Sequence, residues 1–520
     1  MVKAQITPGA YYDSVSLMII SNAVKKIDGV TEALVGMGTD LNRELNDNNP
    51  NLKSPEVSKT TPNDFFVCAN VRDEEVWKAV LAKVEEKLNE KKEDAASNYY
   101  PATLDGALKV QPKTNMAVIS VPGKGGHAKD VAEECLKKGI NCMLFSDNVT
   151  IEEEYYLKSE AVKRGLLVMG PDCGTAIVNH VPLAFANVVR PGNIGMVCAS
   201  GTGTQEVSSI IDQLGGGVSQ VLGTGGRDLK KDIGGIMFKF CLEALIADPQ
   251  TKVIVLVSKP PYPSVQTEVL KMAKEGGKPT VVCFIGGDPI EPKTMGLIPA
   301  VSLEDAARKA VALSKGETPN TFDGFDKSDD EINKLVNDAC ANLKPTQKYM
   351  RALYTGGTLC DETMKYLLTT CGHIYSNIPL QPSDELPNKD VSKMHTALDF
   401  GDDAFTVGRP HPMIDPSLRA ERVIKEANDE TCACIVVDCV IGYGSHEDPA
   451  ADLSDAIKKG KEAAKKAGRD LIVIATVCGT EGDPQNLSKT RETLANAGAI
   501  VMPTNAQACR LAKKIIEKVA

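Results

Sequence analysis

Short apolar runs alternate with longer amphipathic segments along most of the chain. Before residue 110, strand-like runs alternate with helical segments such as residues 74–91, in which apolar residues recur at helical spacing. From residue 116, where MAVISV begins, the rhythm changes to short apolar runs that are each followed by a helical segment. Apolar strands that alternate with helices are typical of parallel sheets. We therefore predict an α/β protein that is preceded by a small α+β domain.

The order of these runs predicts five segments. The small α+β domain covers residues 1–112, and a Rossmann-like domain of βα units covers residues 113–190. A domain with a flavodoxin-like order of elements covers residues 191–316. A stretch rich in Pro, Gly and acidic residues predicts a linker over residues 317–345, and a second flavodoxin-like domain covers residues 346–520.

The second flavodoxin-like domain repeats the first. Residues 350–368 (MRALYTGGTLCDETMKYLL) parallel residues 195–211 (GMVCASGTGTQEVSSII), and each copy has a Gly-rich turn followed by a glutamate, Glu206 or Glu362. The offset between matching pieces grows from about 155 to about 200 residues along the repeat. The later copy therefore carries an insertion, chiefly residues 373–416, which holds the densest group of polar residues in the chain.

Composition and charge exclude several classes of protein. The 520 residues include 59 basic and 69 acidic side chains, so the net charge of -10 does not attract nucleic acid or anionic lipid. The apolar runs are far shorter than the roughly 20 residues of a membrane helix, and the N-terminus resembles no signal peptide. Fifteen cysteines without a C-x-x-C pair fit reduced thiols and no metal site. We predict a cytoplasmic protein that binds neither nucleic acid nor membranes.

The clearest candidate for ligand binding is the turn between the apolar run of residues 195–199 and the helix that follows. Free amides at a helix start favour an anion, and glycines let the anion approach the backbone. We predict that phosphate binds at Ser200, Gly201, Thr202, Gly203 and Thr204. The alternative is a tight turn in which Ser or Thr only caps the helix.

Two further turns are candidates for anion binding, because each follows the end of a predicted strand. The turn of residues 223–228 adds Gly225, Gly226 and the cation Arg227, although Arg227 could also be an ordinary surface residue with its own partner. The repeat supplies a second anion turn at Thr355, Gly356, Gly357 and Thr358. The turn of residues 170–175 also ends a strand, where Cys173 could be exposed.

The insertion supplies the candidate catalytic group. Two prolines fix His411 in a rigid loop, with Arg409 close in sequence. His411 is a candidate for acid-base or phosphate-transfer chemistry and Arg409 for an oxyanion clamp. The alternative is a structural loop in which His411 bonds to the backbone. Asp399 follows an apolar residue, so we expect it to be held inside and to contribute to substrate binding.

Seven stretches carry a family resemblance: DSVSLMIIS, FSDNVTIEEE, GLLVMGPDCGT, PLAFANVV, ASGTGTQE, GGRDL and TVGRPHPMIDP. Through them the chain resembles FdrA-type proteins, which are similar to the α subunit of succinyl-CoA synthetase and other NDP-forming acyl-CoA synthetases. The resemblance makes residues 113–190 a CoA-binding-type domain, residues 191–316 an α-type synthetase domain and residues 346–520 a domain of the β-carboxy-terminal type. It also gives Glu206 a catalytic role, because the matching glutamate of the synthetases supports a phosphohistidine.

The chain departs from the synthetase pattern after residues 280–287 (TVVCFIGG). The G-H-A-G loop that carries the phosphohistidine should follow there, yet the sequence reads DPIEPKTMGLIPA, and the ATP-grasp domain is not found either. The resemblance to FdrA-type proteins implies a subunit of oxamate carbamoyltransferase in anaerobic allantoin breakdown, with phosphate or carbamoyl phosphate as substrate. One alternative is an acyl-CoA synthetase subunit that binds CoA, with Mg²⁺ bound only together with the substrate. The other alternative is a noncatalytic binding subunit. We expect other subunits of the same enzyme as partners, and a homo-oligomer.

Overall fold

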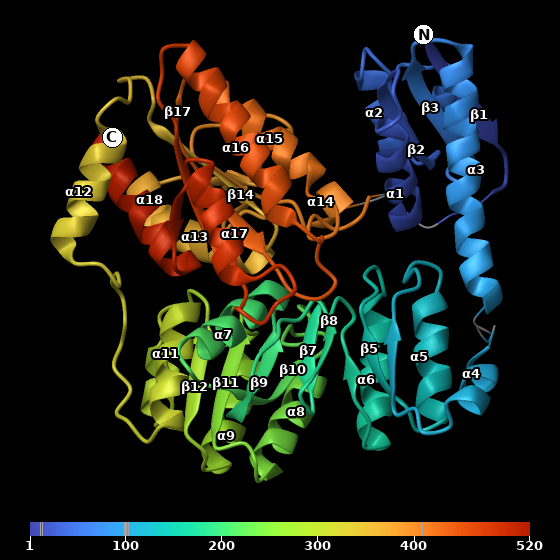
Figure 1. Cartoon of the computed structure of the whole chain (residues 1–520). Coiled ribbons are helices and arrows are strands. Elements are labelled where there is room, and N and C mark those ends of the chain that lie inside the picture. Colours follow the sequence, from blue (N-terminus) through green and yellow to red (C-terminus); the bar gives the residue numbers. More distant parts are fainter. Residues whose placement is uncertain (11, 13, 98–100, 102, 407–408) are drawn as a thin grey trace. The chain divides into compact units, whose positions relative to one another are not determined.

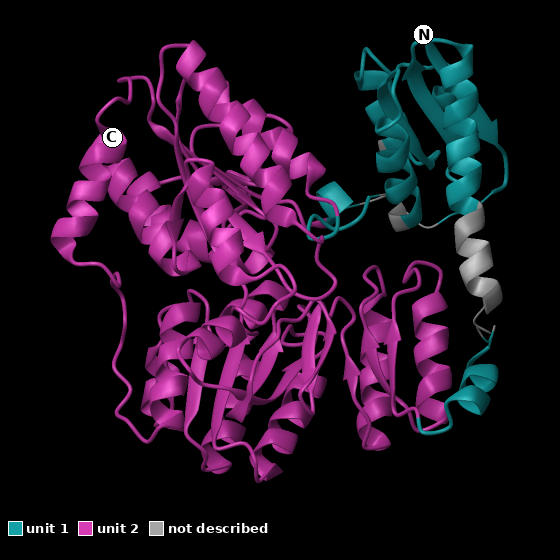
Figure 2. Cartoon of the chain, viewed as in Figure 1, with its two compact units in different colours: residues 1–113, 403–414 teal, residues 114–402, 415–520 magenta. Residues whose placement is uncertain are grey.

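The computed structural model describes residues 1–520 except residues 11, 13, 98–100, 102 and 407–408. The chain divides into two compact units, which Figure 2 shows in different colours. The first unit comprises residues 1–113 and 403–414, and the second comprises residues 114–402 and 415–520. Among the helices that the structure describes, none is both long and apolar enough to cross a membrane.

The first unit holds an antiparallel sheet of three strands in the order β1-β3-β2. Its elements are β1 (Val2–Thr7), α1 (Ser14–Lys25), β2 (Val30–Met37), α2 (Asp40–Asn48), η1 (Val57–Lys59), β3 (Phe65–Val71), α3 (Glu74–Ser97), α4 (Leu104–Val110) and α14 (Asp403–Thr406). Helices α1 and α3 bury apolar side chains such as Trp77 against one face of the sheet, while Phe66 packs with Val57 on the other. The predicted small α+β domain is present.

The second unit begins with a parallel sheet in the order β4-β5-β6, connected by two helices. Its elements are β4 (Met116–Ile119), α5 (His127–Lys137), β5 (Asn141–Leu144), α6 (Ile151–Lys163) and β6 (Val168–Met169). These are the βα units that the sequence predicts from residue 113. The block ends earlier than residue 190, however, because the hairpin β7 (Thr175–Val178) and β8 (Val181–Ala184) joins the next sheet instead. There β7 pairs with the exposed edge of β10 (Val218–Gly223).

A seven-stranded sheet follows, in the order β13-β12-β11-β9-β10-β7-β8 (Figure 1). Its other strands are β9 (Pro191–Ala199), β11 (Val253–Ser258), β12 (Thr280–Phe284) and β13 (Ile298–Pro299). Its helices are α7 (Gly201–Gln213), α8 (Ile236–Ala247), α9 (Pro263–Glu275), α10 (Ile290–Thr294) and α11 (Leu303–Ser314). The strands from β9 to β13 are parallel, so their carboxyl ends and the turns that follow them lie along one edge.

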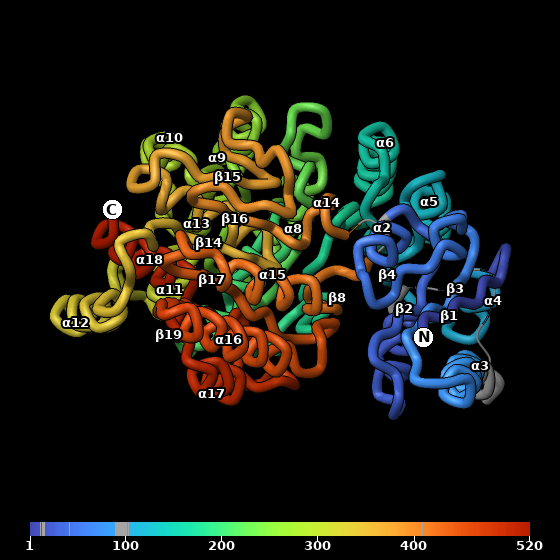
Figure 3. The backbone as a smooth tube through the Cα atoms, turned by 90° about the horizontal axis from the view of Figure 1, so that it is seen from above, coloured from blue at the N-terminus to red at the C-terminus, as the bar shows by residue number. Residues whose placement is uncertain are grey.

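The last part of the chain forms a six-stranded parallel sheet in the order β15-β16-β14-β17-β18-β19. Its strands are β14 (Tyr349–Tyr354), β15 (Tyr375–Ser376), β16 (Thr396–Asp399), β17 (Cys432–Val440), β18 (Ile472–Cys478) and β19 (Ile500–Met502). Its helices are α13 (Gly357–Cys371), η2 (Pro382–Asp384), α15 (Ser417–Ala427), α16 (Pro449–Lys466), α17 (Leu487–Asn496) and α18 (Asn505–Val519). The predicted insertion adds β15 and β16 beside β14, which Figure 3 shows from above.

The predicted linker of residues 317–345 contains a helix that the composition did not indicate. Helix α12 (Asp329–Cys340) starts at a capping box of Ser328 and Glu331, and it buries Ile332 and Val336. These two residues lie four positions apart and therefore share one face of the helix. The acidic first turn looks like a solvated linker, but the apolar face anchors the segment to the core.

One apolar cluster runs through both flavodoxin-like blocks. It joins Val207 and Ile211 of α7 to Leu359 of α13 and to Leu511 and Ile515 of α18. Every residue of α7 from Thr202 to Asp212 is buried, because α7 packs against both blocks. The two blocks therefore share a single core, and α7 and α13 both enter this core from the turns that precede them.

Candidate functional site: the crossing of two helix starts

The turns before α7 and α13 meet each other. The hydroxyl oxygens of Ser200 and Thr358 lie 2.7 Å apart. A Cβ atom at Gly203 would lie 2.8 Å from the Cγ2 of Thr358, and one at Gly356 would lie 2.6 Å from the Oγ1 of Thr202. The glycines of the two predicted anion turns are thus needed where the helix starts cross, because any side chain there would hold the helices apart.

Among the described residues, the start of α7 has no side-chain cap and is open beside Gly201. Ser200 is the N-cap residue, yet its side chain makes no capping hydrogen bond, and the first turn contains no acidic residue. A Cβ atom at Gly201 would meet nothing within 4 Å. The hydroxyl of Thr204 instead donates to the carbonyl of Ser200. The simple capping alternative therefore does not describe Ser200, and the amides at this helix start remain suited to an anion.

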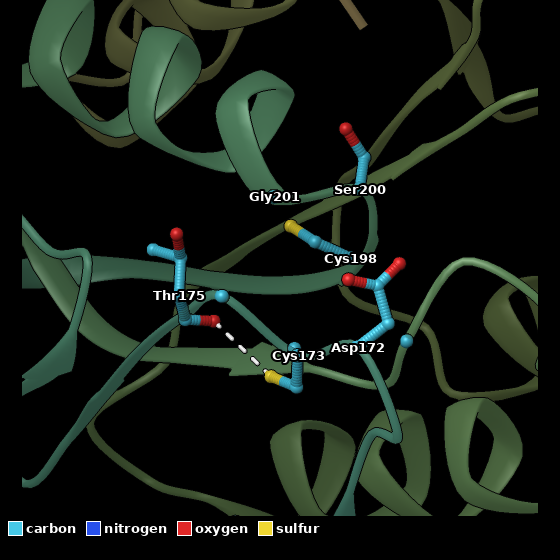
Figure 4. Close-up of a pocket in the computed structure, with 9 residues that line it drawn as sticks. Asp172, Cys173, Thr175, Cys198, Ser200 and Gly201 are labelled. Carbon is cyan, nitrogen blue, oxygen red and sulfur yellow. Dashed lines mark hydrogen bonds between the residues drawn. The ribbon is translucent and has the colours of Figure 1, made fainter. Parts of the chain in front are cut away.

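A pocket opens beside Gly201, where three turns come together (Figure 4). Its enclosed volume is about 10 Å³, and its lining residues are Asp172, Cys173, Gly174, Thr175, Cys198, Ser200, Gly201, Gly223 and Gly225. Figure 4 shows the carboxyl group of Asp172 pointing toward the backbone at Ser200. The sequence singled out these turns separately, and the structure brings them to one place.

The two thiols of the pocket are not nucleophiles at neutral pH. Burial raises the pKa of Cys173 to about 12 and that of Cys198 to about 12. Cys173 donates to the carbonyl of Thr175 over 3.6 Å. Both sulfurs are therefore protonated and line the pocket as small apolar groups.

The turn before α13 is already occupied by carboxylates of the chain. The amides of Thr355 and Gly356 donate to Asp438 over 2.8 Å and 2.9 Å, and Arg419 pairs with the same carboxylate at 2.7 Å. Asp399 is 8% exposed, and one of its oxygens lies 2.3 Å from the place of a Cβ atom on Gly357. Burial raises the pKa of Asp399 to about 7. Of the two predicted anion turns, the one at Ser200 is open beside Gly201. The one at Thr355 already donates its amides to Asp438.

The turn of residues 223–228 contributes backbone to the pocket, but its arginine has other partners. Gly225 has a φ of +87°, and a Cβ atom there would lie 2.3 Å from the carbonyl of Pro171. Gly226 is exposed and does not line the pocket. Arg227 forms an ion pair with Glu154 at 2.9 Å and donates to the carbonyl of Val149 over 2.7 Å. This is the surface alternative that the sequence left open for Arg227.

A buried ion network lies behind this turn. The ammonium group of Lys158 lies 2.7 Å from a carboxylate oxygen of Glu154 and 2.7 Å from one of Asp228, and it donates to the carbonyl of Thr224 over 2.9 Å. All three charged side chains are at most 1% exposed. With three acceptors for its three donors, Lys158 is fully satisfied and ties α6 to the pocket turn.

Glu206 and Glu362 have matching roles in the two halves of the repeat. Glu206 of α7 accepts a hydrogen bond of 3.0 Å from the amide of Asn505, the first residue of α18. Glu362 of α13 accepts one of 2.9 Å from the amide of Leu303, the first residue of α11. Each glutamate therefore caps a helix of the other block. We call these two contacts the reciprocal caps.

Burial sets the ionisation of the reciprocal caps. It raises the pKa of Glu206 to about 7 and also raises that of Glu362. The hydrogen bond from Asn505 acts in the opposite direction on Glu206. Glu206 thus contacts a helix start of the other block, and its predicted catalytic role stays a prediction.

His411 and Arg409 belong to the segment of residues 403–414, which is part of the first unit, whereas the pocket is part of the second. A shared site between them stays a prediction. The Nδ1 atom of His411 accepts a hydrogen bond of 3.2 Å from the amide of Met413, and burial lowers the pKa of His411 to about 4. The imidazole is therefore neutral at pH 7, with its proton on Nε2, and the loop shows the backbone bond that the structural alternative expected.

Sequence reasoning missed Lys158, Asn505 and Lys259. Lys158 lies in a helix whose pattern resembles a solvated surface, and Asn505 follows an ordinary strand end. Lys259 did have a signal, because it directly follows the wholly apolar run of residues 253–257 and Ser258. A charged residue at the carboxyl end of a buried parallel strand is placed at the ligand-binding edge of the sheet.

Comparison with known proteins places the chain in a family. It is 45% identical over 522 residues to the uncharacterized protein YahF of Escherichia coli (strain K12), and the match covers 99% of both chains. The chain belongs to the YahF family. Family models match three parts of it, described as "AllF, heavy metal-associated domain" over residues 1–102, "CoA binding domain" over residues 189–286 and "CoA-ligase" over residues 353–515. The YahF family is thus acyl-CoA synthetase-like, as the resemblance implied, and the match for CoA binding lies in the first flavodoxin-like block.

More distant relatives of this YahF family member are subunits of ligases. The chain is 30% identical over 193 residues to the ADP-forming sulfoacetate-CoA ligase subunit SauD of Bilophila wadsworthia, a match that covers 35% of this chain and 63% of SauD. It is 29% identical over 149 residues to the ADP-forming succinate-CoA ligase subunit alpha 2 of Archaeoglobus fulgidus, with 28% of this chain and 50% of that subunit covered. The chain thus spans between half and two thirds of these ligase subunits.

A solved structure of acetyl-CoA synthetase 1 from Ca. Korarchaeum cryptofilum matches 81% of this chain and 88% of its own, with 18% identity and a TM-score of 0.33. The α/β fold with a small N-terminal domain is the one that the sequence predicted. The CoA binding model, however, matches residues 189–286 and not residues 113–190, where the CoA-binding-type domain was expected.

Proposed function

We propose that the chain is a subunit of an acyl-transferring enzyme of the acyl-CoA synthetase type, and that it binds phosphate at the start of α7. The observation that carries this proposal is the pocket beside Gly201, where the open amides of a helix start meet the turns of residues 172–175 and 223–225. Phosphate or a developing oxyanion is stabilised by such preorganised donors. The ligase names of the relatives and the two CoA-related family models support the same class of reaction.

The pocket is small. Its enclosed volume is about 10 Å³, roughly the room for one water molecule, whereas sites for drug-sized ligands have about 300–1,000 Å³. A phosphate or the reacting end of a substrate would therefore lie partly outside the pocket, at its open side, and a whole nucleotide or coenzyme does not fit in it. When CoA is bound to such an enzyme, its thiol accepts the acyl group. Because the named relatives are subunits, we propose that this chain also works with partner subunits, which would supply the nucleotide chemistry.

The loop after β12 supports a reaction without a protein-bound phosphoryl group. Residues 285–300 contain no histidine. Lys365 of α13 donates to the carbonyl of Ile285, and a Cβ atom at Gly286 would lie 2.5 Å from its side chain. This loop is therefore held against α13 by Lys365. In this chain the acyl group would pass directly between phosphate and CoA, with the amides at the start of α7 holding the phosphate oxygens. Phosphate would attack the thioester carbon of an acyl-CoA, the C–S bond would break, and the CoA thiolate would leave with an acyl phosphate as the other product; in the reverse direction the thiol would accept the acyl group.

Carbamoyl transfer is the second candidate. In that reaction phosphate attacks the carbamoyl carbon of oxalurate, the C–N bond to oxamate breaks, and carbamoyl phosphate leaves. The observation that favours it is the carboxyl group of Asp172, which points toward Ser200 and offers an acceptor for a ligand N–H beside the amide donors. None of the relatives reported above carries this activity in its name.

Replacing Gly201 by valine should weaken the binding of inorganic phosphate by about tenfold or more. The side chain would project into open space and block the approach of an anion to the amides, without a clash inside the protein. Calorimetric titration measures the affinity, and a thermal melt checks the fold. Gly324→Val is the matched control, because a Cβ atom there also meets nothing within 4 Å. Unchanged affinity in folded Gly201→Val would remove the phosphate site.

A steady-state assay with co-expressed partner subunits separates the two candidate reactions. The acyl-CoA synthetase reaction requires CoA, whereas phosphate-dependent cleavage of oxalurate does not. Turnover only in the presence of CoA supports the first candidate. Turnover of oxalurate and phosphate without CoA would replace it by carbamoyl transfer.

A further inference from the structure

Lys259 lies next to the crossing of α7 and α13. Ser258 of β11 is the register partner of Ala199 in β9, so Lys259 follows β11 at the level where Ser200 follows β9. Neighbouring strands lie about 4.8 Å apart, a separation that an extended lysine side chain spans. The pocket lies toward β10, on the opposite side of β9. Ser200 therefore lies between the pocket and Lys259.

The ammonium group of Lys259 is only loosely held. It lies 3.8 Å from Asp361, and its side chain is 45% exposed. In the part of the chain that the structure describes, no hydrogen bond to this ammonium group is found, and Lys259 has no further partner. Its donors remain available to a ligand, in contrast to those of Arg227, which binds Glu154 and Val149.

The charges around Lys259 include both signs. Asp361 has a closer partner in Lys365, whose ammonium group lies 2.7 Å from its other oxygen. Asp438 is paired with Arg419. Burial raises the pKa of Asp399 to about 7, and Asp402 lies close enough to contribute to that rise. The carboxylate nearest to Lys259, that of Asp361, is therefore shared between two lysines, which leaves Lys259 able to bind an anion.

We propose that Lys259 is an anion-binding residue, whose ammonium group binds a phosphoryl oxygen at the crossing of α7 and α13, beside the hydroxyls of Ser200 and Thr358. It supplies the side-chain cation that the sequence had assigned to Arg227. The inference rests on the proposed function, since it adds a residue to the phosphate site at the start of α7. A charge-assisted hydrogen bond of this kind is about twice as strong as a neutral one.

The test is the affinity of the full chain for inorganic phosphate, measured by calorimetric titration at pH 6.5. Lys259→Met should weaken binding by about tenfold or more, and Lys259→Arg should retain most of it. Lys271→Met is the control, because Lys271 is 70% exposed on α9 and its pair with Glu275 is 3.9 Å long. This control makes the same change in net charge without touching the crossing. A thermal melt of each variant confirms that it is folded.

The outcomes separate the inference from the function on which it rests. A wild-type chain that binds phosphate, with weakened binding in Lys259→Met and unchanged binding in Lys271→Met, supports the inference. Equal affinity of wild type and Lys259→Met overturns the inference and leaves the phosphate site standing. An equal loss in both methionine variants also overturns it, because net charge alone would then explain the effect. A wild-type chain that binds no phosphate overturns both proposals.

Discussion

Lys158→Met should lower the free energy of unfolding by about 3–5 kcal/mol, the usual cost of removing one partner from a buried ion pair. Lys158 is fully buried, and it joins Glu154 to Asp228 and to the carbonyl of Thr224. Methionine keeps the apolar stem but leaves two buried carboxylates facing each other. Denaturant titration of the wild type and the variant measures the difference, and a lower melting temperature should accompany it.

Two further variants make this prediction sharper. Lys459→Met removes an exposed lysine that pairs with Asp455 at 2.7 Å, and it should change stability little, because exposed pairs are screened by water. Lys158→Met/Asp228→Asn should recover part of the loss, since it removes one of the two carboxylate charges while Asn keeps an acceptor for the amide of Phe238. Equal losses for Lys459→Met and Lys158→Met would contradict the prediction.

The stability of the chain should fall as the pH rises through 7, and Glu206→Gln should remove much of this dependence. Burial gives Glu206 a pKa of about 7 in the folded chain, against 4.5 for an ordinary glutamate. A group with a raised folded pKa stabilises the fold fully below the unfolded value and loses that contribution as pH rises through the folded value. From pH 4.5 to pH 8 the loss from Glu206 is about 3 kcal/mol.

The measurement is the melting temperature between pH 5 and pH 8. The wild-type value should fall over this range, with Asp399 contributing in the same direction. Glu206→Gln stays neutral and still offers an oxygen to the amide of Asn505, so its melting temperature should fall less and should exceed the wild-type value at pH 8. Glu275→Gln, on the exposed part of α9, is the control. Parallel curves for wild type and Glu206→Gln would show that Glu206 has an ordinary pKa in the folded chain.

The internal repeat made much of the fold predictable. The match between residues 195–211 and 350–368 located both strand-helix junctions, and the structure places them face to face. Apolar strands, glycine turns and helical spacing are local features, so their positions can be read along the chain. Helix α12 was not predicted because its acidic first turn is typical of a solvated linker. Its apolar face is stable only because it packs against the neighbouring core.

The partners of the polar groups could not be predicted in the same way. Arg227 looks like a ligand-binding cation until Glu154, more than 70 residues earlier, is seen beside it. The turn at Thr355 looks as open as the turn at Ser200 until Asp438, 83 residues later, fills it. Whether a glycine-rich turn is free for a ligand depends on which distant carboxylate contacts it. The local sequence pattern contains no information about such a contact. Lys259 shows the converse, because its position at a strand end was visible while its lack of a close partner was not.

The reciprocal caps also bear on how the chain is made. Glu206 and the amide that it accepts from are 299 residues apart, so at about 5–20 residues per second the ribosome needs about 15–60 s to deliver residue 505 after residue 206. Helix α7 packs mainly against α11 of its own block, but its contacts with α13 and β18 form only after those elements have been made. The nascent chain thus carries a helix that is covered on one side only until the second block is synthesised. We expect its yield to depend on chaperone supply and on translation speed more than that of a chain whose domains close one after another.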